Sequence, residues 1–217
     1  MTLAGLLFAG FVPLWAADGD APVKIAHSIV ATYPHDRGAF TQGLVYAGGA
    51  LYESTGLYGR SSVRRVDLKS GAAELIRPLA PQYFGEGLTA FGDRLIQLTW
   101  HSGKAFVYSR EDLRPVGEHR YATNGWGLTH DGKHLIMSDG SATLYFLDPE
   151  RFSEVRRLEV RDHLGAVTFL NELEYVGGDI YANVWRSSRI LRNDAASGRV
   201  TGFIDLSALA APMEREP

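Results

Sequence analysis

The stretch Phe84-Gly85-Glu86-Gly87-Leu88 recurs, with substitutions, at four places in a chain of 217 residues. One copy begins 44 residues earlier, and two begin 40 and 85 residues later. These copies are Phe40-Thr41-Gln42-Gly43-Leu44, Asn124-Gly125-Trp126-Gly127-Leu128 and Phe169-Leu170-Asn171-Glu172-Leu173. A period of 40–45 residues is typical of proteins that repeat one supersecondary unit.

The segments that follow each copy keep the same offset without a gap. A second β-prone segment begins eleven residues after each start, at Leu51, Leu95, Leu135 and Ile180. Gly or Asp-Gly turns lie between the first and second segments, which predicts hairpins. A third and a fourth β-prone segment complete each unit, as at Ser62–Asp67 and Ala73–Pro78.

Four strands in each unit of 40–45 residues indicate the blade of a β-propeller. A four-stranded sheet cannot bury both of its faces alone, whereas blades packed in a ring bury them against each other. A β-sandwich or a single barrel is the alternative. Neither of these predicts a repeat with constant offsets.

The four units leave the ring incomplete. They span Ala39–Leu206, and Val23–Tyr33 predicts one more strand before them. In a ring closed by pairing the two chain ends, that strand would be the outermost strand of a fifth blade. The other strands of that blade would follow Leu206, but Ser207–Pro217 shows no strand pattern. The chain therefore forms either four blades with an extra strand or a ring that stops short of a fifth blade.

Composition narrows the class of protein. Apolar residues make up 45% and charged residues 22%, which suits a folded domain with a sizeable core. The net charge of −3, with acids and bases interspersed, gives no basic patch for nucleic acid. The absence of cysteine excludes disulfides, thiolate metal sites and a cysteine nucleophile. The seven histidines do not show metal-ligand spacing, so we expect no zinc site.

The N-terminal segment predicts a signal peptide over residues 1–17. Leu3–Ala17 is nearly all apolar or small, too short to span a bilayer, and Ala16 and Ala17 offer a cleavage site. We therefore expect a secreted or periplasmic protein with no membrane segment in its mature form. A buried N-terminal element or a membrane anchor is the alternative, since no Lys or Arg precedes the apolar run.

The channel of the propeller is the expected functional site, because the first strand of each blade lines it. In each copy the Gly-Leu pair is kept, except that Glu replaces Gly in the fourth copy. The residue immediately before this pair differs from copy to copy. The residues at this position are Gln42, Glu86, Trp126 and Asn171. The end of the second strand adds Trp100 and Trp185, with Gly56 and Gly140 as the equivalents in the other units. This pattern predicts side chains that converge on a ligand.

These residue types indicate acid–base chemistry on an amide. Gln and Asn can bind an amide through both donor and acceptor, and Trp provides an apolar wall with one N–H donor. Glu86, surrounded by indoles, should have a raised pKa that suits a proton shuttle. The alternative is that Glu86 caps a turn and the tryptophans pack the blades together. Glu172 alternates with Asn171, so we expect it to face a neighbouring blade and form a structural hydrogen bond.

Five motifs together resemble the plant and bacterial type of glutaminyl cyclase, the glutamine cyclotransferase family. The resemblance covers about Val23–Leu206. The motifs are Tyr33–Asp36, Ala39–Leu44, Phe84–Leu88, Leu170–Tyr175 and Ala182–Trp185. It implies an all-β, five-bladed propeller over residues 23–217 that lacks most of its fifth blade. It also implies a secreted acyltransferase that uses no zinc or other cofactor, unlike the animal enzymes.

The resemblance implies that the chain converts the N-terminal glutamine of a peptide to pyroglutamate with release of ammonia. Glu86 matches the general acid/base, and Gln42 and Asn171 match the residues that orient the carboxamide. Phe40, Phe84, Trp100, Trp126 and Trp185 match the walls that bind the substrate. The expected partners are peptides or proteins with an N-terminal Gln, and the expected state is a monomer.

The chain departs from the family at its C-terminus. A last stretch, roughly Asn-Gly-Ile-Ala, then Thr-Gly-Lys and Trp-Pro, supplies the first strands of the fifth blade and an active-site lysine in the family. The last lysine here is Lys133, in a turn. A non-catalytic propeller that binds peptides is therefore the alternative function. A calcium-dependent lactonase is a third, which the single central carboxylate disfavours.

Overall fold

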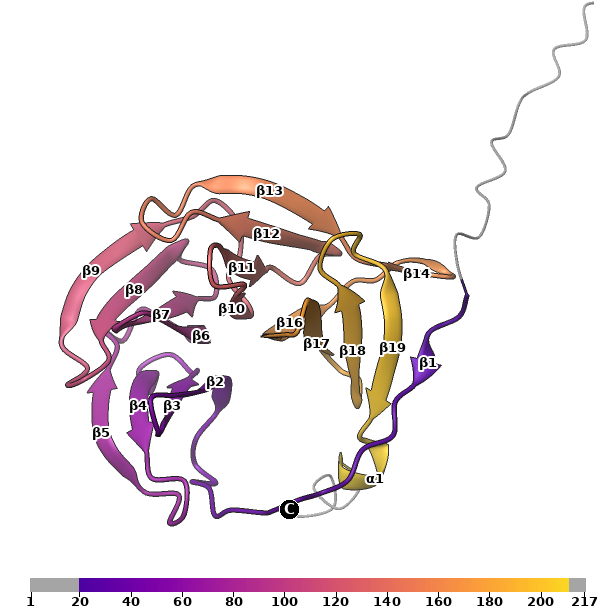
Figure 1. Ribbon diagram of the computed structural model, residues 1–217. Helices are drawn as coiled ribbons and strands as arrows, with labels where there is room; N and C mark the ends of the chain where they lie inside the picture. Colours follow the sequence, from indigo (N-terminus) through magenta and orange to yellow (C-terminus); the bar gives the residue numbers. More distant parts are fainter. Residues whose placement is uncertain (1–19, 211–217) are drawn as a thin grey trace, which may run out of the picture.

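The computed structural model describes residues 20–210, which contain four large sheets, each with four antiparallel strands and one of them extended by a short parallel fifth strand (Figure 1). The sheets stand side by side around a common centre, so the predicted all-β propeller that lacks most of its fifth blade is confirmed. The predicted signal peptide, residues 1–17, lies outside the described residues. Within residues 20–210 no helix is long and apolar enough to cross a membrane.

Each blade runs outward from the centre in chain order. Blade 1 contains β2 (Thr41–Ala47), β3 (Ala50–Thr55), β4 (Ser62–Val66) and β5 (Ala73–Pro78). Blade 2 contains β6 (Gly85–Phe91), β7 (Arg94–Thr99), β8 (Lys104–Ser109) and β9 (Pro115–Arg120). Blade 3 contains β10 (Leu128–His130), β11 (Leu135–Ser138), β12 (Thr143–Leu147) and β13 (Glu154–Glu159). Blade 4 contains β16 (Leu170–Val176), β17 (Asp179–Val184), β18 (Arg189–Asp194) and β19 (Val200–Asp205).

Four short elements lie outside this pattern. A two-stranded ribbon, β14 (Arg161–Asp162) and β15 (Gly165–Ala166), connects blades 3 and 4. The helix α1 (Ser207–Ala210) follows blade 4, and β1 (Val23–Lys24) pairs in parallel with β19.

The core consists of three hydrophobic clusters, one at each contact between consecutive blades. Tyr52 and Val63 of blade 1 pack against Leu88 and Leu95 of blade 2. A second cluster joins blades 2 and 3, and a third joins blades 3 and 4. Burial at about 25 cal/mol per Å² of apolar surface makes these interfaces the main source of stability.

Glycine allows the innermost strands to approach closely. A Cβ atom on Gly43 would lie 2.5 Å from the amide nitrogen of Leu88, and one on Gly87 would lie 2.5 Å from the carbonyl oxygen of Trp126. In place of such a Cβ, the Gly87 amide donates a hydrogen bond of 2.6 Å to that oxygen. The repeated Gly of the sequence is therefore the contact point between neighbouring blades.

A fully buried polar residue also links blades 1 and 2. Gln97 Nε2 donates to Ser54 Oγ at 2.7 Å and to the Ser62 carbonyl at 3.1 Å. Its Oε1 accepts from the Tyr108 hydroxyl at 3.1 Å. Because the buried amide has partners for both its donor and its acceptor, these hydrogen bonds offset the cost of its desolvation and fix the relative position of the two blades.

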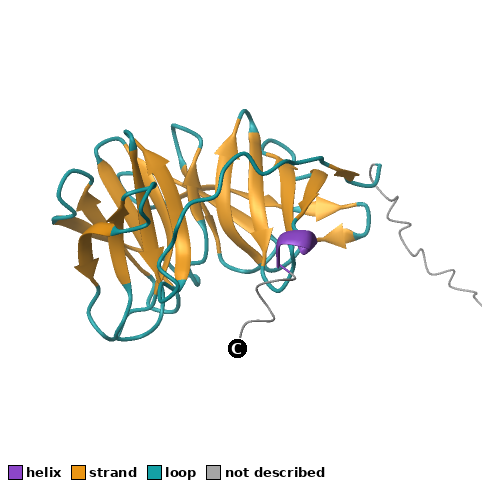
Figure 2. Ribbon diagram, turned by 90° about the horizontal axis from the view of Figure 1, so that it is seen from below, coloured by secondary structure: helices purple, strands orange, loops and turns teal. Residues whose placement is uncertain are grey.

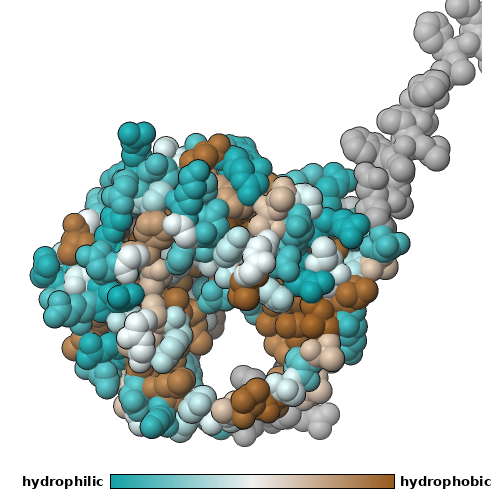
Figure 3. All heavy atoms as spheres, viewed as in Figure 1, coloured by the Kyte–Doolittle hydropathy of each residue, from teal (hydrophilic) through white to brown (hydrophobic). Residues whose placement is uncertain are grey.

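An opening separates blade 4 from blade 1, and among residues 20–210 the segment of residues 25–39 crosses it (Figures 1 and 2). We refer to it as the crossing segment. The space-filling view shows that the opening passes through the molecule, with apolar surface on its blade 4 side (Figure 3). The strand predicted over Val23–Tyr33 is wrong beyond Lys24, because the residues after Ile25 cross the opening with no neighbouring strand.

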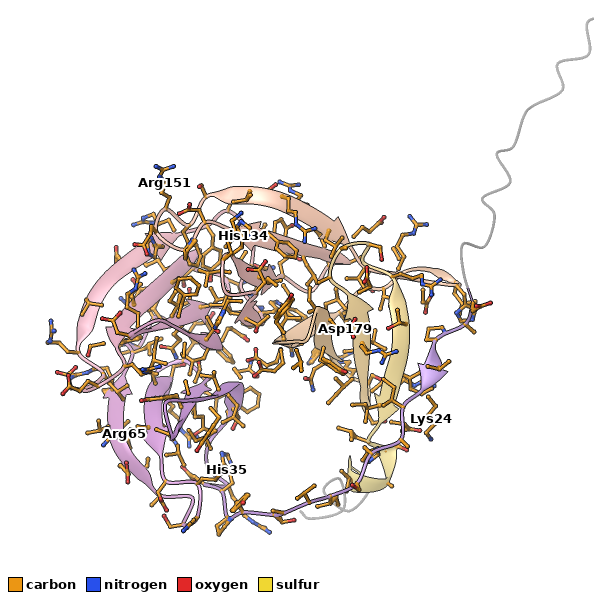
Figure 4. All side chains as sticks on the ribbon, viewed as in Figure 1. Lys24, His35, Arg65, His134, Arg151 and Asp179 are labelled. Atoms are coloured by element: carbon orange, nitrogen blue, oxygen red, sulfur yellow. The ribbon has the colours of Figure 1, made fainter. Side chains whose placement is uncertain are left out.

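Polar contacts hold both ends of the crossing segment. Lys24, next to β19 in Figure 4, forms an ion pair of 3.1 Å with Asp205. At the other end His35 Nε2 lies 2.8 Å from the buried carboxylate of Glu53, and Arg64 pairs with Asp36 at 2.9 Å. The N-terminal segment is thus attached to the first blade and to the last.

The close approach at the centre predicts a large cost for one added methyl group. In Gly127→Ala the new Cβ would collide with the carbonyl oxygen of Asn171 and the Cα of Glu172. We expect the free energy of unfolding to fall by about 2–3 kcal/mol, measured by urea denaturation. Gly117→Ala is the matched control, because its Cβ would meet only Val107 at 3.9 Å. Equal stability of the two variants would contradict this role of the central glycines.

Candidate functional site

A cavity of about 230 Å³ lies at the centre of the four blades. We refer to it as the pocket. The sequence analysis predicted every one of its lining residues: Phe40, Gln42, Phe84, Glu86, Trp100, Trp126, Asn171 and Trp185. The structure thus brings together all eight predicted site residues from four separate blades. Their chemical roles stay predictions.

β-Bulges aim the polar residues into the pocket. The register of the innermost strand shifts between Thr41 and Gly43 in blade 1, which leaves Gln42 as the extra residue. Equivalent shifts occur around Glu86 in blade 2 and around Asn171 in blade 4. A bulge interrupts the regular alternation of side chains, so the position before the repeated Gly can face the channel.

Two glycines make room for two of the aromatic walls. A Cβ on Gly56 would overlap the Phe84 ring, and one on Gly140 would lie 2.8 Å from the Trp126 indole. At the equivalent position, the other two blades carry Trp100 and Trp185, which line the pocket themselves. In blades 2 and 4 a tryptophan at this position is itself a wall of the pocket. In blades 1 and 3 a glycine at this position leaves space for an aromatic ring from another position.

Among the described residues that line the pocket, Glu86 alone carries a carboxyl group, and the residue is 4% exposed. Burial raises its pKa from an ordinary value of 4.5 to about 8. A hydrogen bond of 2.7 Å from Gln42 Nε2 to Oε2 acts in the opposite direction but is the weaker effect. The raised pKa expected from the sequence is therefore found, and its cause is desolvation between aromatic walls.

Three side chains offer further polar atoms to a ligand. Trp126 Nε1 is buried and has no hydrogen-bond acceptor among the described residues. The carboxamide of Asn171 also makes no side-chain hydrogen bond there, although its backbone carbonyl accepts from Ser138 Oγ at 2.8 Å. The Gln42 amide donates to Glu86, so Gln42 orients this carboxylate, a contact that the sequence analysis did not foresee.

Glu172 is a second buried carboxyl near the centre. It replaces the glycine found in the other three copies, and both of its carboxylate oxygens are buried without a hydrogen-bond partner in the described part of the chain. The structural hydrogen bond expected for Glu172 stays a prediction: the backbone amides of Leu44 in blade 1 and Leu128 in blade 3 stabilise its carboxylate, and their effect on its pKa is opposite to that of burial. Burial, followed by repulsion from Glu174, raises the pKa of Glu172 well above its ordinary value.

A second layer of side chains contacts the aromatic walls without lining the pocket itself. Tyr58 packs edge-on against Phe84 with ring centroids 5.4 Å apart. His101 stacks on Trp100 at 3.9 Å, and the guanidinium carbon of Arg186 lies 4.3 Å from the centroid of the Trp185 ring. We refer to Tyr58, His101 and Arg186 as the rim. The sequence analysis did not single them out, because only the fold places them beside the walls.

Titratable groups elsewhere do not form a second centre. Residues 20–210 contain no group of three or more His, Cys, Asp or Glu side chains that could hold a metal ion. No lysine or arginine lines the pocket within the described residues. The chemistry available in the pocket is thus one carboxyl of raised pKa, neutral amide and indole donors, and aromatic surface.

Comparisons with known proteins agree with this architecture. The model of the glutamine cyclotransferase family matches residues 5–217. A glutaminyl-peptide cyclotransferase of Arabidopsis thaliana is 43% identical over 217 residues, which cover 96% of this chain and 68% of the relative. The crystal structure of the Myxococcus xanthus glutaminyl cyclase superposes with a TM-score of 0.84 at 38% identity, covering 90% of this chain and 84% of that one.

More distant structures share the fold alone. A hydrazine synthase of Kuenenia stuttgartiensis, 18% identical, matches with a TM-score of 0.53 over 82% of this chain and 52% of that chain. Fold and pocket together thus define a β-propeller with one buried carboxylate in an aromatic channel. The chain belongs to the glutamine cyclotransferase family.

The buried carboxyl of Glu172 predicts a pH-dependent stability. Above about pH 4.3 the unfolded chain ionises this group, whereas the folded chain keeps it protonated until the raised pKa. Unfolding therefore releases a proton, and the contribution to stability is present at low pH and falls as the pH rises. Glu172→Gln should raise the melting temperature at pH 7–8 and leave it nearly unchanged near pH 4.

Glu118→Gln is a control of opposite sign. The hydrogen bond from Lys104 lowers the pKa of this exposed carboxylate, so the substitution should destabilise slightly at neutral pH or have no effect. A melting temperature of Glu172→Gln that lies below the wild-type value at pH 8 would show that the backbone amides of Leu44 and Leu128 outweigh the desolvation of Glu172, and would contradict this prediction.

Proposed function

We propose that the chain is a glutaminyl-peptide cyclotransferase, an acyltransferase that converts the N-terminal glutamine of peptides and proteins to pyroglutamate. The observation that carries this proposal is the buried Glu86 carboxyl, which lines a pocket whose other polar groups are the amides and indoles of Gln42, Asn171 and three tryptophans. The two similar proteins named as glutaminyl cyclases support it.

The reaction needs one proton transfer within the substrate. The neutral α-amine attacks the γ-carboxamide carbon, a C–N bond forms, and the carbonyl oxygen becomes an oxyanion. Glu86, as carboxylate, takes one proton from the attacking nitrogen and passes it to the departing nitrogen. The C–N bond to that nitrogen breaks, ammonia leaves, and Glu86 returns to its starting form. No oxidant, reductant or water enters the balance.

The raised pKa of Glu86 suits both halves of this transfer. A general acid/base works best when its pKa is near the operating pH, and the Glu86 value of about 8 meets this condition. The α-amine of a peptide has a pKa of about 7.7–8.0, so both groups are partly in the reactive form at neutral pH. Gln42 holds the carboxylate through its hydrogen bond to Oε2.

The remaining donors suit the oxyanion. Trp126 Nε1 is buried with no acceptor among the described residues, and a substrate carbonyl oxygen would supply one. The free carboxamide of Asn171 can bind the leaving amide through its acceptor and donor. The aromatic walls would hold the glutamine side chain folded back towards its own amine, which lowers the entropy cost of ring closure.

A non-catalytic peptide-binding propeller is the second candidate function. The opening between blades 4 and 1 favours it, since no cation from a fifth blade reaches the pocket within residues 20–210. The retained and strongly perturbed Glu86 favours the enzyme, because a binding site gains nothing from a buried acid. We further propose a secreted or periplasmic monomer.

Glu86→Gln tests the catalytic proposal. The amide keeps the shape of the side chain and can still bind Gln42, but it cannot shuttle a proton. We expect kcat for a Gln-initiated peptide to fall by about 10²–10⁴-fold, measured by ammonia release. In the wild type, kcat/KM should increase with pH up to about 8, where Glu86 ionises.

A stability measurement separates lost chemistry from lost folding. Between pH 4.5 and 8 the folded chain keeps Glu86 protonated while the unfolded chain ionises it, so wild-type stability falls across this window. Glu86→Gln should therefore melt above the wild type at pH 8. Wild-type turnover by this variant would refute the acid/base role.

Independence from metal ions is a further prediction. We propose that carboxyl, amide and indole groups suffice for the reaction, so preincubation with a strong chelator should leave kcat/KM unchanged. Addition of zinc or calcium to the chelated protein should likewise have no effect. Loss of activity that one of these ions restores would contradict the proposal.

A further inference from the structure

The guanidinium of Arg186 lies at the rim, directly against a wall of the pocket. Arg186 occupies the turn between β17 and β18, which is closed by a hydrogen bond of 3.0 Å from the Ser187 amide to the Val184 carbonyl. Its guanidinium carbon lies 4.3 Å from the ring centroid of Trp185, whose side chain lines the pocket and is 45% exposed. The positive charge of Arg186 therefore lies next to a residue that would contact a ligand in the pocket.

The backbone of Arg186 adopts an uncommon conformation. Arg186 has a φ of 63°, in the left-handed region that is uncommon for a residue other than glycine. Such a conformation costs free energy and persists only where the surrounding structure imposes it. Contact with the indole face adds a cation–π interaction that holds the guanidinium over Trp185.

The charge of Arg186 is not neutralised. Other arginines pair with carboxylates, as Arg64 does with Asp36, Arg94 with Glu150 and Arg192 with Asp179. Arg186 forms no ion pair or hydrogen bond with any of the residues 20–210, and its recorded contact is the Trp185 ring. The other potentially cationic rim residue, His101, lies 2.8 Å from Asn124 Oδ1.

An unpaired guanidinium beside the pocket has a defined chemical preference. Its planar set of N–H donors matches a carboxylate, which it can bind through two parallel hydrogen bonds. Consecutive Cα atoms are about 3.8 Å apart, so the residue after a pocket-bound glutamine would lie near the rim. We propose that Arg186 is a specificity-determining residue that binds a carboxylate carried by the second residue of the substrate, directly after the N-terminal glutamine. This inference rests on the proposed function.

Two sources can supply that carboxylate. One is the side chain of an acidic second residue, and the other is the C-terminal carboxylate of a dipeptide. Binding is best measured in the Glu86→Gln background, in which the substrate is not consumed, through the fluorescence of the pocket tryptophans. Four peptides separate the sources: Gln-Glu-Ala-amide against Gln-Gln-Ala-amide, and Gln-Ala with a free C-terminus against Gln-Ala-amide.

The carboxylate-bearing peptide of at least one pair should bind about two- to fivefold more tightly at low ionic strength, as expected for an exposed ion pair. The pair that shows the difference identifies the source. Arg186→Gln should abolish the preference, and added salt should reduce it. Arg189→Gln is the matched control, because Arg189 stacks at 4.6 Å on Phe203, which does not line the pocket.

Each result decides one question. Equal affinities within both pairs, or a preference that survives Arg186→Gln, would overturn the inference. Loss of the preference in Arg189→Gln as well would assign it to the general surface potential and would also overturn it. Cyclisation of Gln-Gln-Ala-amide by the wild type is measured separately. Its absence together with an Arg186-dependent preference would refute the proposed reaction and leave the inference about the ligand standing.

Discussion

The structure depends on the need of each four-stranded sheet to bury both faces against its neighbours. Three hydrophobic clusters meet this need at the three contacts between consecutive blades. Glycine at the innermost strands brings the backbones of adjacent blades into direct contact. Because the strands converge so closely, the bulged residue beside each contact is directed into a common space. The pocket therefore follows from the way the blades pack.

The site and the fold make opposing demands at this centre. Two carboxyls, Glu86 and Glu172, are buried with few partners, and burial raises the pKa of both. Each of them lowers the stability of the folded chain at neutral pH. The unpaired indole N–H of Trp126 adds to this cost. Between blades 4 and 1 the ring is open, so blade packing stabilises the fold only at the other three interfaces. These three interfaces must offset the free-energy cost of the buried polar groups at the centre.

The repeat made much of the fold and the site predictable. Constant offsets align Gln42, Glu86 and Asn171 in the sequence, and the structure brings them to one pocket. Local β propensity failed at Val23–Tyr33, because a strand also needs a neighbouring edge and only Val23 and Lys24 have one. The register shift around Asn171 could not be predicted, because a bulge is set by packing between blades and leaves no pattern in the sequence.

The most direct test of the account is mass spectrometry of a synthetic Gln-initiated peptide after incubation with the purified chain of 217 residues. If Glu86 and the donors gathered by the four blades suffice for ring closure, the peptide will lose one ammonia and become resistant to aminopeptidase. An unchanged peptide mass, with a chain that is folded and binds the peptide, would contradict the account and favour a peptide-binding propeller.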